Sequence, residues 1–309
     1  QEHVKRAMII AAAGGHNVLL IGPPGSGKTM LAKRLPTILP PLTLEESVET
    51  TRIHSVSGEL APGTALLARR PVRSPHHSAS MPALVGGGTI PQAGEVSLAH
   101  YGVLFLDEFP EFSRSSLEAL RQPLEDAQVT IARAHGTVSF PASFTLVAAM
   151  NPCPCGYYTD PRRPCKCTPL QIDKYLSRIS GPLLDRIDIH IEVPGVPFSA
   201  LRSQTDGTPS SAMRDQVLPA RDPQRHRFDG NPVTVNGRMS GKLLRKFCKL
   251  DDAGESVLRQ AMTELGLSAR AHDKILRVSR TIADLADRDD VRAEDVLEAI
   301  HYRRLDRQL

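Results

Sequence analysis

The residues with the clearest chemistry form one run, Gly22–Thr29, which reads G-P-P-G-S-G-K-T. The run follows an apolar stretch at Val18–Ile21 and precedes a helix-prone segment at Met30–Leu35. Glycines let backbone N–H groups turn inward around phosphates, a lysine reaches the β- and γ-phosphates, and a threonine hydroxyl completes a Mg²⁺ shell. The pattern therefore predicts an ATP-binding loop whose contacts come from Gly22, Pro23, Pro24, Gly25, Ser26, Gly27, Lys28 and Thr29.

A second apolar run, Val103–Leu106, ends in Asp107 and Glu108. A short, wholly apolar run is typical of a strand that is buried on both faces of a parallel sheet, and such sheets bind ligands at the carboxyl ends of their strands. Asp107 is therefore predicted to hold Mg²⁺ and Glu108 to polarise the water that attacks the γ-phosphate. The alternative is a solvated strand end, but the position after a phosphate loop favours hydrolysis of ATP.

A third buried strand is predicted at Thr145–Met150, followed by Asn151. An amide at this position can orient the attacking water or contact the γ-phosphate. The alternative is a turn-forming asparagine before Pro152.

The composition is that of a globular protein with no membrane segment. Of 309 residues, 40% are hydrophobic and 23% are charged, and the net charge is +4. No apolar stretch approaches the length of a membrane span, and no signal peptide is recognisable, so we expect a cytoplasmic protein that contacts no membrane. Because Trp is absent and aromatic residues make up 4%, a surface that stacks bases is disfavoured. The first residue is Gln, so we expect further protein upstream.

The order of the predicted elements gives an α/β core followed by helices. Residues 1–198 alternate strand-like and helix-like segments, with a breaker-rich insert at about 55–98, a hairpin at about 129–142 and a Cys-rich loop at 152–168. A capping box, Thr43–Glu46, opens a helix before the insert. Residues 199–238 are polar and rich in Pro and Gly, which predicts a linker or mobile segment. Residues 239–309 carry amphipathic helices and form a predicted helical lid domain.

With these features in place, the chain resembles the AAA+ ATPases, and within them the ComM/YifB family of magnesium chelatase-like proteins. The resemblance rests on the phosphate loop, on 73–78 (RSPHHS), 104–110 (LFLDEFP) and 151–156 (NPCPCG), and on 178–190 (RISGPLLDRIDIH). It implies a P-loop core with an insert in its second helix, a hairpin before the Asn151 strand, and a working homo-oligomer of six subunits. It also implies an N-terminal Lon-like domain that is absent from these residues.

The same resemblance assigns roles to three arginines. Arg186 matches the arginine finger that reaches the γ-phosphate in a neighbouring subunit, where a guanidinium neutralises charge in the transition state. The alternative for Arg186 is a salt bridge to Asp185 or Asp188. Arg270 matches the second sensor, which contacts the nucleotide from the start of a lid helix, and its alternative is a solvated helix-start arginine. Arg178 is a reserve candidate for contact between subunits.

Four of the five cysteines lie close together in the sequence, as Cys153, Cys155, Cys165 and Cys167. Thiolates in this number form tetrahedral Zn²⁺ sites, although C-x-x-C is the commoner spacing. No metal and an iron–sulfur cluster are the two alternatives. Cys248 lies in an apolar helical pattern and is expected in the core, whereas His76 and His77 are expected at the surface.

The resemblance implies a ring motor acting on single-stranded or branched DNA, with branch migration during recombination or natural transformation as the activity. The hairpin tip carries Arg133 and His135, which are the predicted DNA contacts, and Arg69, Arg70 and Arg73 are secondary candidates. The alternative for each arginine is an ordinary surface cation. Two other functions stay open: a chelatase-type motor that remodels a partner protein, and a nucleotide-gated scaffold or protease regulator.

Overall fold

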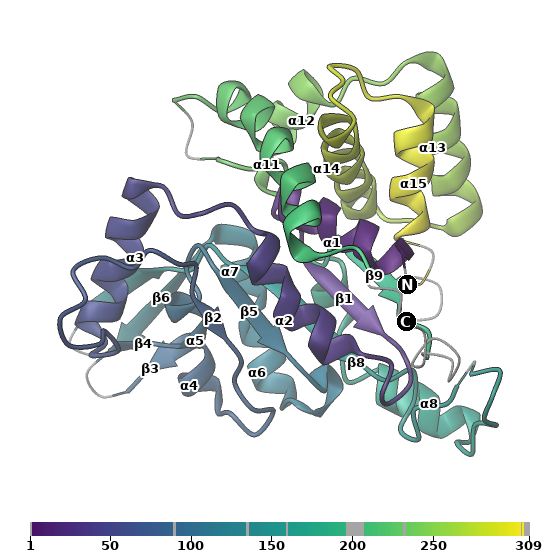
Figure 1. The fold of residues 1–309 in the computed structure, drawn as a ribbon. Helices are drawn as coiled ribbons and strands as arrows, with labels where there is room; N and C mark the ends of the chain where they lie inside the picture. The colour runs from purple at the N-terminus through teal and green to yellow at the C-terminus, as the bar shows by residue number, and fades with distance from the viewer. Residues whose placement is uncertain are drawn as a thin grey trace. The chain divides into compact units, whose positions relative to one another are not determined.

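The computed structural model describes residues 2–88, 91–133, 136–158, 160–195, 207–230, 233–303 and 305 (Figure 1). The chain divides into two compact units. The first unit combines residues Gln1–Pro40 with Ile187–Leu309, and the second unit is Pro41–Arg186. This division differs from the linear order of domains expected from the sequence, because the N-terminal helix and first strand pack with elements that follow the second unit in the chain.

The first unit contains two sheet strands, β1 and β9, and most of the long helices. β1 pairs in parallel with β9, with Val18 opposite Ile189 and Ile21 opposite Glu192. All four residues of β1 are buried, as expected for a strand covered on both faces. Helix α1 packs against α11 and α14, and α14 packs against α15. The elements are α1 (Glu2–Gly14), β1 (Val18–Ile21), α2 (Lys28–Ile38), β9 (Ile189–Glu192), α11 (Ser210–Arg227), η2 (Asn236–Arg238), α12 (Gly241–Phe247), α13 (Asp252–Leu265), α14 (Ala269–Leu285) and α15 (Ala293–His301).

The second unit contains three parallel strands, β2, β5 and β8, and two short hairpins. β5 and β8 are aligned so that Leu106 lies opposite Ala148, which brings the carboxyl ends of both strands to one edge. The predicted capping box is confirmed: Thr43 Oγ1 accepts the N–H of Glu46, and the Glu46 carboxylate accepts the N–H of Thr43. The elements are α3 (Leu44–Val56), β2 (Val72–Arg73), α4 (Met81–Val85), β3 (Gly86–Gly87), β4 (Gln92–Ala93), α5 (Glu95–Leu98), β5 (Val103–Leu106), η1 (Phe109–Glu111), α6 (Arg114–Ala119), α7 (Arg121–Asp126), β6 (Gln128–Arg133), β7 (Gly136–Pro141), β8 (Thr145–Met150), α8 (Pro169–Leu176) and α9 (Gly181–Leu184).

The pair β1·β9 of the first unit and the pairs β2·β5 and β5·β8 of the second unit are all parallel. The predicted α/β class is therefore confirmed, as are the buried strands expected at Val18–Ile21, Val103–Leu106 and Thr145–Met150. The predicted hairpin is confirmed as β6 and β7, which pair from Gln128 opposite Pro141 to Arg133 opposite Gly136. The helical character of the C-terminal region is confirmed by α12, α13, α14 and α15.

The linker prediction is wrong over residues 210–227, which form the helix α11. The prolines Pro219 and Pro223 lie inside this helix and made the segment read as irregular. The helix nevertheless buries one face, made by Met213, Val217, Ala220 and Gln224, and Gln224 Nε2 donates to Ala13 O at 2.9 Å. Packing of this face outweighs the lost backbone hydrogen bonds of two prolines. Residues 199–206 and 231–232 of the predicted linker lie outside the described residues.

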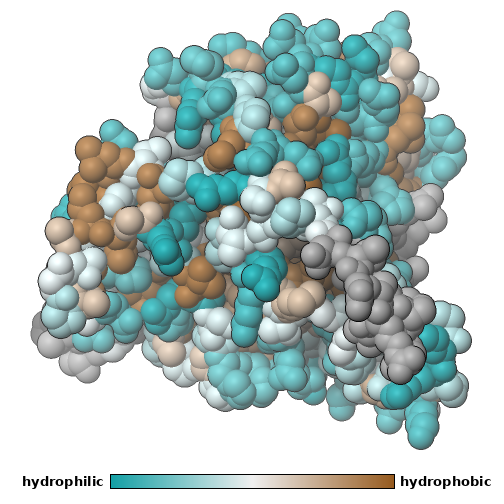
Figure 2. All heavy atoms as spheres, viewed as in Figure 1, coloured by the Kyte–Doolittle hydropathy of each residue, from teal (hydrophilic) through white to brown (hydrophobic). Residues whose placement is uncertain are grey.

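Apolar side chains also lie on the surface of α3. Leu44, Val48 and Val56 are 67%, 50% and 76% exposed, and Figure 2 shows apolar surface over this helix, at the left of the view. Their spacing places them along one side of the helix. An apolar helix side of this kind is typical of a protein interface. Among the described residues, each helix is too short or too polar to cross a bilayer.

Candidate active site

The predicted phosphate loop lies in the first unit, between β1 and α2. Gly25 and Gly27 have φ angles of +75° and +91°, which side chains rarely adopt, so both positions require glycine. Gly22 is required for a different reason, because a Cβ atom there would lie 2.2 Å from Val193 O. The backbone is therefore shaped by glycine along the whole loop, as expected for a backbone that surrounds phosphates.

Lys28 is 8% exposed and its ammonium group lies inside this loop. Nζ donates to Gly22 O at 2.7 Å and to Pro23 O at 3.0 Å. Ser26 is buried, whereas Thr29 and Pro24 are exposed on the open side of the loop. A cation held by carbonyl oxygens at the amino end of a helix provides a site for a polyphosphate, because the helix dipole and the lysine act in the same direction.

The predicted acidic residues lie in the second unit, directly after β5. Asp107 Oδ1 accepts the N–H of Glu108 at 3.0 Å, and Glu108 has a left-handed backbone with φ of 53°. Asn151 follows β8, which is the neighbour of β5 in parallel register. The structure therefore brings the ends of these two strands together at one edge, as the sequence predicts for Asp107, Glu108 and Asn151.

The Glu108 carboxylate has a partner that sequence reasoning missed. His77 Nδ1 lies 2.9 Å from Glu108 Oε2, and the His77 side chain is 33% exposed against 58% for Glu108. The His77 ring also contacts Phe112 edge-on, with centroids 6.5 Å apart. A signal was present in the sequence, since His77 belongs to the run 73–78 on which the family resemblance rests, but its contact with Glu108 depends on tertiary structure.

The structure gives Arg186 a partner that was not weighed in the sequence. Its guanidinium forms an ion pair with the Glu125 carboxylate, and Nη1 donates to Pro182 O at 2.6 Å. Asp188 instead pairs with Lys274, whose Nζ lies 2.6 Å from Asp188 Oδ1. The side chain of Arg186 is 11% exposed and lines an open groove of about 620 Å³. Lining residues from the base of the hairpin and from α6 and α7 include Val129, Ile131, Glu118, Arg121 and Glu125.

Arg178 is also engaged within the second unit. Its Nη1 donates to Glu111 Oε2 at 2.6 Å and to Pro110 O at 3.3 Å, just after the acidic pair of β5. Arg270 lies in the first unit, exposed in the first turn of α14, where Ser268 Oγ caps the helix. Lys274 lies one turn further along α14 and pairs with the buried Asp188, so the start of this helix is fixed.

The structure disfavours two of the secondary DNA candidates. Arg73 binds the Glu95 carboxylate through Nε and Nη2, at 2.5 and 2.8 Å. Arg70 donates to Tyr101 O at 2.7 Å and to Glu46 Oε2 at 2.8 Å. Both guanidinium groups are thus held by the chain's own acceptors, and Arg69 is exposed. The side chain of Arg133 and the whole of His135 lie outside the described residues.

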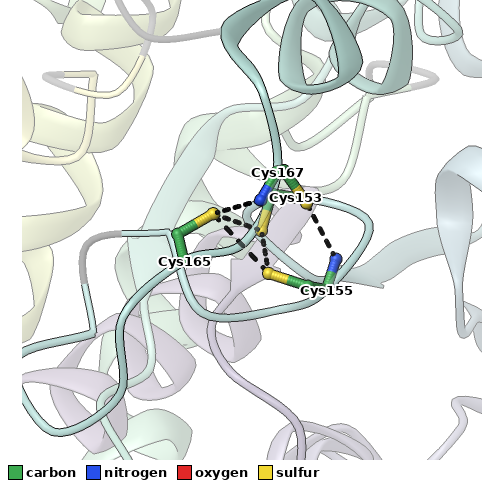
Figure 3. A group of neighbouring side chains, drawn as sticks. All are labelled: Cys153, Cys155, Cys165 and Cys167. Atoms are coloured by element: carbon green, nitrogen blue, oxygen red, sulfur yellow. Dashed lines mark hydrogen bonds between the residues drawn. The ribbon is translucent and has the colours of Figure 1, made fainter.

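The four clustered cysteines converge after β8 (Figure 3). Their Sγ atoms all lie within 4.8 Å of one another, and all five cysteines of the chain are free thiols. Backbone N–H groups of Lys166 and Tyr157 lower the pKa of Cys155 to about 6. Cys248 lies apart from the cluster and is buried, as expected, and burial raises the pKa of its thiol to about 12.

Comparison with known proteins identifies the family. Residues 1–201 match the family described as magnesium chelatase, subunit ChlI, and residues 207–303 match its C-terminal family. The chain belongs to the magnesium chelatase subunit ChlI family. The resemblance expected from the sequence is confirmed, and with it an AAA+-type P-loop core.

The similar curated proteins include two from bacteria. The competence protein ComM of Haemophilus influenzae is 50% identical over 311 residues, and the protein YifB of Salmonella typhimurium is 46% identical over the same length. Both comparisons cover 100% of this chain and 60% of the relative. The DNA replication licensing factor mcm7-B of Xenopus laevis is 25% identical over 331 residues, which cover 97% of this chain and 40% of that protein. The chain therefore spans about 60% of the length of its bacterial relatives.

Proposed function

We propose that this chain is the ATP-hydrolysing part of a ring motor that acts on DNA. The observation that carries the ATPase proposal is the buried Lys28 ammonium inside a loop whose backbone requires glycine at Gly22, Gly25 and Gly27. A loop that only reversed the direction of the chain would not need a buried cation. It would also not need a glycine packed as closely as Gly22 is against Val193 O. Membership of the ChlI family supports the same proposal, because this family is of the AAA+ type.

The residues divide the reaction between them. Lys28 and the loop N–H groups bind the β- and γ-phosphates, and Thr29 and Asp107 are the ligands for Mg²⁺. When bound, Mg²⁺ neutralises the charge that develops on the phosphate oxygens. Glu108 polarises the attacking water and Asn151 orients it. His77 is a positioning residue, since its ring nitrogen holds the Glu108 carboxylate from the side.

The proposed hydrolysis needs a second subunit. Arg186 pairs with Glu125 of its own chain, and this contact must be exchanged if the guanidinium is to reach a phosphate bound by a neighbour. An arginine supplied from another subunit accelerates phosphoryl transfer by about 10³–10⁵. The exposed apolar side of α3 supports assembly of several copies, and the family resemblance supports six. Arg270 is proposed to contact the nucleotide in the same assembly.

The DNA part of the proposal rests on the named relatives and on the hairpin. One relative is a competence protein and another is a DNA replication licensing factor. The β6–β7 hairpin has exposed residues such as Val138, and Arg133 belongs to its last residue pair. An arginine in the hairpin supports the proposal because arginines contact DNA phosphates. Branch migration is the proposed activity, with single-stranded or branched DNA as the partner.

Membership of a magnesium chelatase family favours a second candidate, a motor that remodels a chelatase partner. The two candidates differ in what stimulates ATP hydrolysis. DNA stimulates the first, whereas only a chelatase partner stimulates the second.

One experiment tests the proposal: the rate of ATP hydrolysis against chain concentration, with and without single-stranded and branched DNA. We expect the rate per chain to rise with concentration and to rise again with DNA. Glu108→Gln should abolish turnover, and Glu264→Gln, an exposed position on α13, is the matched control. Arg133→Ala should lose the stimulation by DNA. Normal turnover by Glu108→Gln would contradict the catalytic assignment, and a rate indifferent to DNA would contradict the DNA part.

A further inference from the structure

We propose that Cys153, Cys155, Cys165 and Cys167 bind one Zn²⁺ ion, and that this ion holds Asn151 in place at the end of β8. The four residues come from two parts of one irregular loop, and Figure 3 shows their sulfur atoms turned toward a common centre. Binding of the metal stands on the geometry of the cluster alone. The consequence for Asn151 rests on the proposed function.

The distances between the sulfur atoms fit a single tetrahedral ion. Zn²⁺ binds thiolates at about 2.3 Å, and a tetrahedron of that size places its sulfur atoms about 3.8 Å apart. Cys153 Sγ lies 3.4 Å from Cys155 Sγ and 3.7 Å from Cys165 Sγ, and the latter two are 3.6 Å apart. An iron–sulfur cluster distributes its thiolates over several iron atoms and therefore needs a wider set of ligands. The alternative of a cluster is disfavoured on this ground.

Backbone N–H groups surround the sulfur atoms, as expected around thiolates. Cys155 N donates to Cys167 Sγ at 3.4 Å, Tyr158 N to Cys153 Sγ at 3.3 Å, and Cys167 N to Cys165 Sγ at 3.4 Å. Such donors in the second coordination sphere disperse the negative charge that four thiolates leave on a divalent ion.

The loop has little else to hold its conformation. Among the described residues of 152–168, the buried ones are Cys153 and Gly156. A segment that buries so little apolar surface gains little from hydrophobic packing, so metal binding must supply the free energy that orders it. The C-x-C spacing is unusual for zinc, but the sulfur atoms of both pairs still converge in this loop.

The cluster connects the Asn151 strand to the next helix. Cys153 follows Asn151 by two residues, and Cys167 directly precedes Thr168, the N-cap of α8. Burial raises the pKa of Tyr175 on α8. The backbone N–H of Asn151 donates to the Tyr175 oxygen and has a smaller, opposite effect on this pKa. Beyond α8, Arg178 contacts Glu111 and Pro110, next to the acidic pair of β5. A metal ion at the cluster therefore fixes the segment that joins Asn151 to α8. Through Arg178, the same segment contacts the residues that follow β5.

The metal content of the purified chain tests the first part. We expect one Zn²⁺ per chain by elemental analysis, and loss of it in Cys155→Ser and in Cys167→Ser. Cys248→Ser is the matched control, because it removes a buried thiol of the first unit that lies outside the cluster. Since a variant may fold poorly, Co²⁺ exchange into the unaltered chain gives a second readout, with the thiolate charge-transfer and intense visible bands of tetrahedral cobalt. A chain without zinc, a chain with stoichiometric iron, or a cobalt spectrum without thiolate bands would overturn the site.

Reversible removal of the metal tests the second part. We expect chelation to lower kcat for ATP about 10- to 100-fold, as misplacement of a positioning group does, with KM little changed and with recovery when Zn²⁺ is returned. Full activity after chelation would leave the zinc site standing and overturn its link to Asn151. If the metal-loaded chain hydrolyses no ATP, the proposed function falls and the link falls with it, whereas the zinc content still decides the metal site.

Discussion

In the first unit, the Asp284 carboxylate is 1% exposed, whereas in the second unit the Glu108 carboxylate is 58% exposed. Asp284 accepts both terminal nitrogens of Arg227, at 2.7 and 2.8 Å, together with Arg280 Nε and Asn236 Nδ2. Glu108 has one ion-pair partner, His77. One carboxylate is enclosed by donors, and the other faces solvent with most of its acceptor capacity free for another molecule.

The same difference applies to the cations. Lys274 pairs with Asp188, which is 2% exposed, in the first unit, and Arg280 is also 2% exposed. In the second unit, Arg178 and Arg186 bind glutamates that are 44% and 59% exposed. Removing one partner of a buried pair leaves an uncompensated charge and costs about 3–5 kcal/mol, whereas exposed pairs contribute about 0–1 kcal/mol. The pairs of Asp188 and Asp284 therefore maintain the fold of the first unit, whereas those of Arg178 and Arg186 in the second unit can change partners during a reaction.

The largest expected effect is on catalysis. Arg186→Ala should lower the rate of ATP hydrolysis by about 10³–10⁵, because the transferred guanidinium is lost. Its free energy of unfolding should change by less than about 1 kcal/mol, since Glu125 remains solvated. Steady-state hydrolysis and chemical denaturation measure the two effects, with the exposed Arg114→Ala as control. Turnover close to normal would show that Arg186 only stabilises its own unit. Mixing Arg186→Ala with Lys28→Ala should restore part of the activity in mixed assemblies.

The next effect is on stability. Asp284→Asn should lower the free energy of unfolding by about 3–5 kcal/mol, because Arg280 and Arg227 would keep their charges without a buried counter-ion. Denaturation in urea measures this change. The control is Asp287→Asn, an exposed position with φ of 52° that asparagine accepts. An Asp284→Asn chain as stable as the control would break the comparison, since buried and exposed carboxylates would then contribute equally.

The smallest effect concerns His77. His77→Ala should lower kcat about 10-fold, less than the 10²–10⁴-fold that loss of a general base costs, because Glu108 keeps its carboxylate but loses its support. KM for ATP and the free energy of unfolding should stay unchanged, which separates a positioning role from a structural one. His76→Ala removes the neighbouring imidazole, which stacks on His77 but bonds Ser78, and serves as control. Equal kcat values for the two variants would remove His77 from the mechanism.

The sequence predicted the features that are determined locally. The phosphate loop, the capping box at Thr43 and the buried strands depend on residues adjacent in the chain, so their patterns were sufficient. Helix α11 was missed because Pro219 and Pro223 suggested a loop, although the spacing of Met213, Val217, Ala220 and Gln224 gave a helical signal.

The contacts of the candidate site could not be predicted in the same way. Arg186 and its partner Glu125 are 61 residues apart in the sequence, and Glu108 and its partner His77 are 31 residues apart. No local sequence pattern encodes pairs at such separations. The division into units was missed for the same reason, since α1 and α14 lie far apart in sequence. The four cysteines were an exception, because two short C-x-C segments marked their convergence in advance.

The discontinuous first unit has a consequence for biosynthesis. Within that unit β1 pairs with β9, and α1 packs against α11 and α14. The three partners β9, α11 and α14 follow residue 186 and therefore leave the ribosome after the whole second unit. The second unit is contiguous and can fold while the rest is still being translated. Until those partners are synthesised, Ile9, Ile10 and the alanines of α1, which are buried in the folded unit, remain exposed to solvent. Chaperones that bind apolar segments should therefore bind α1 until α11 and α14 have been synthesised.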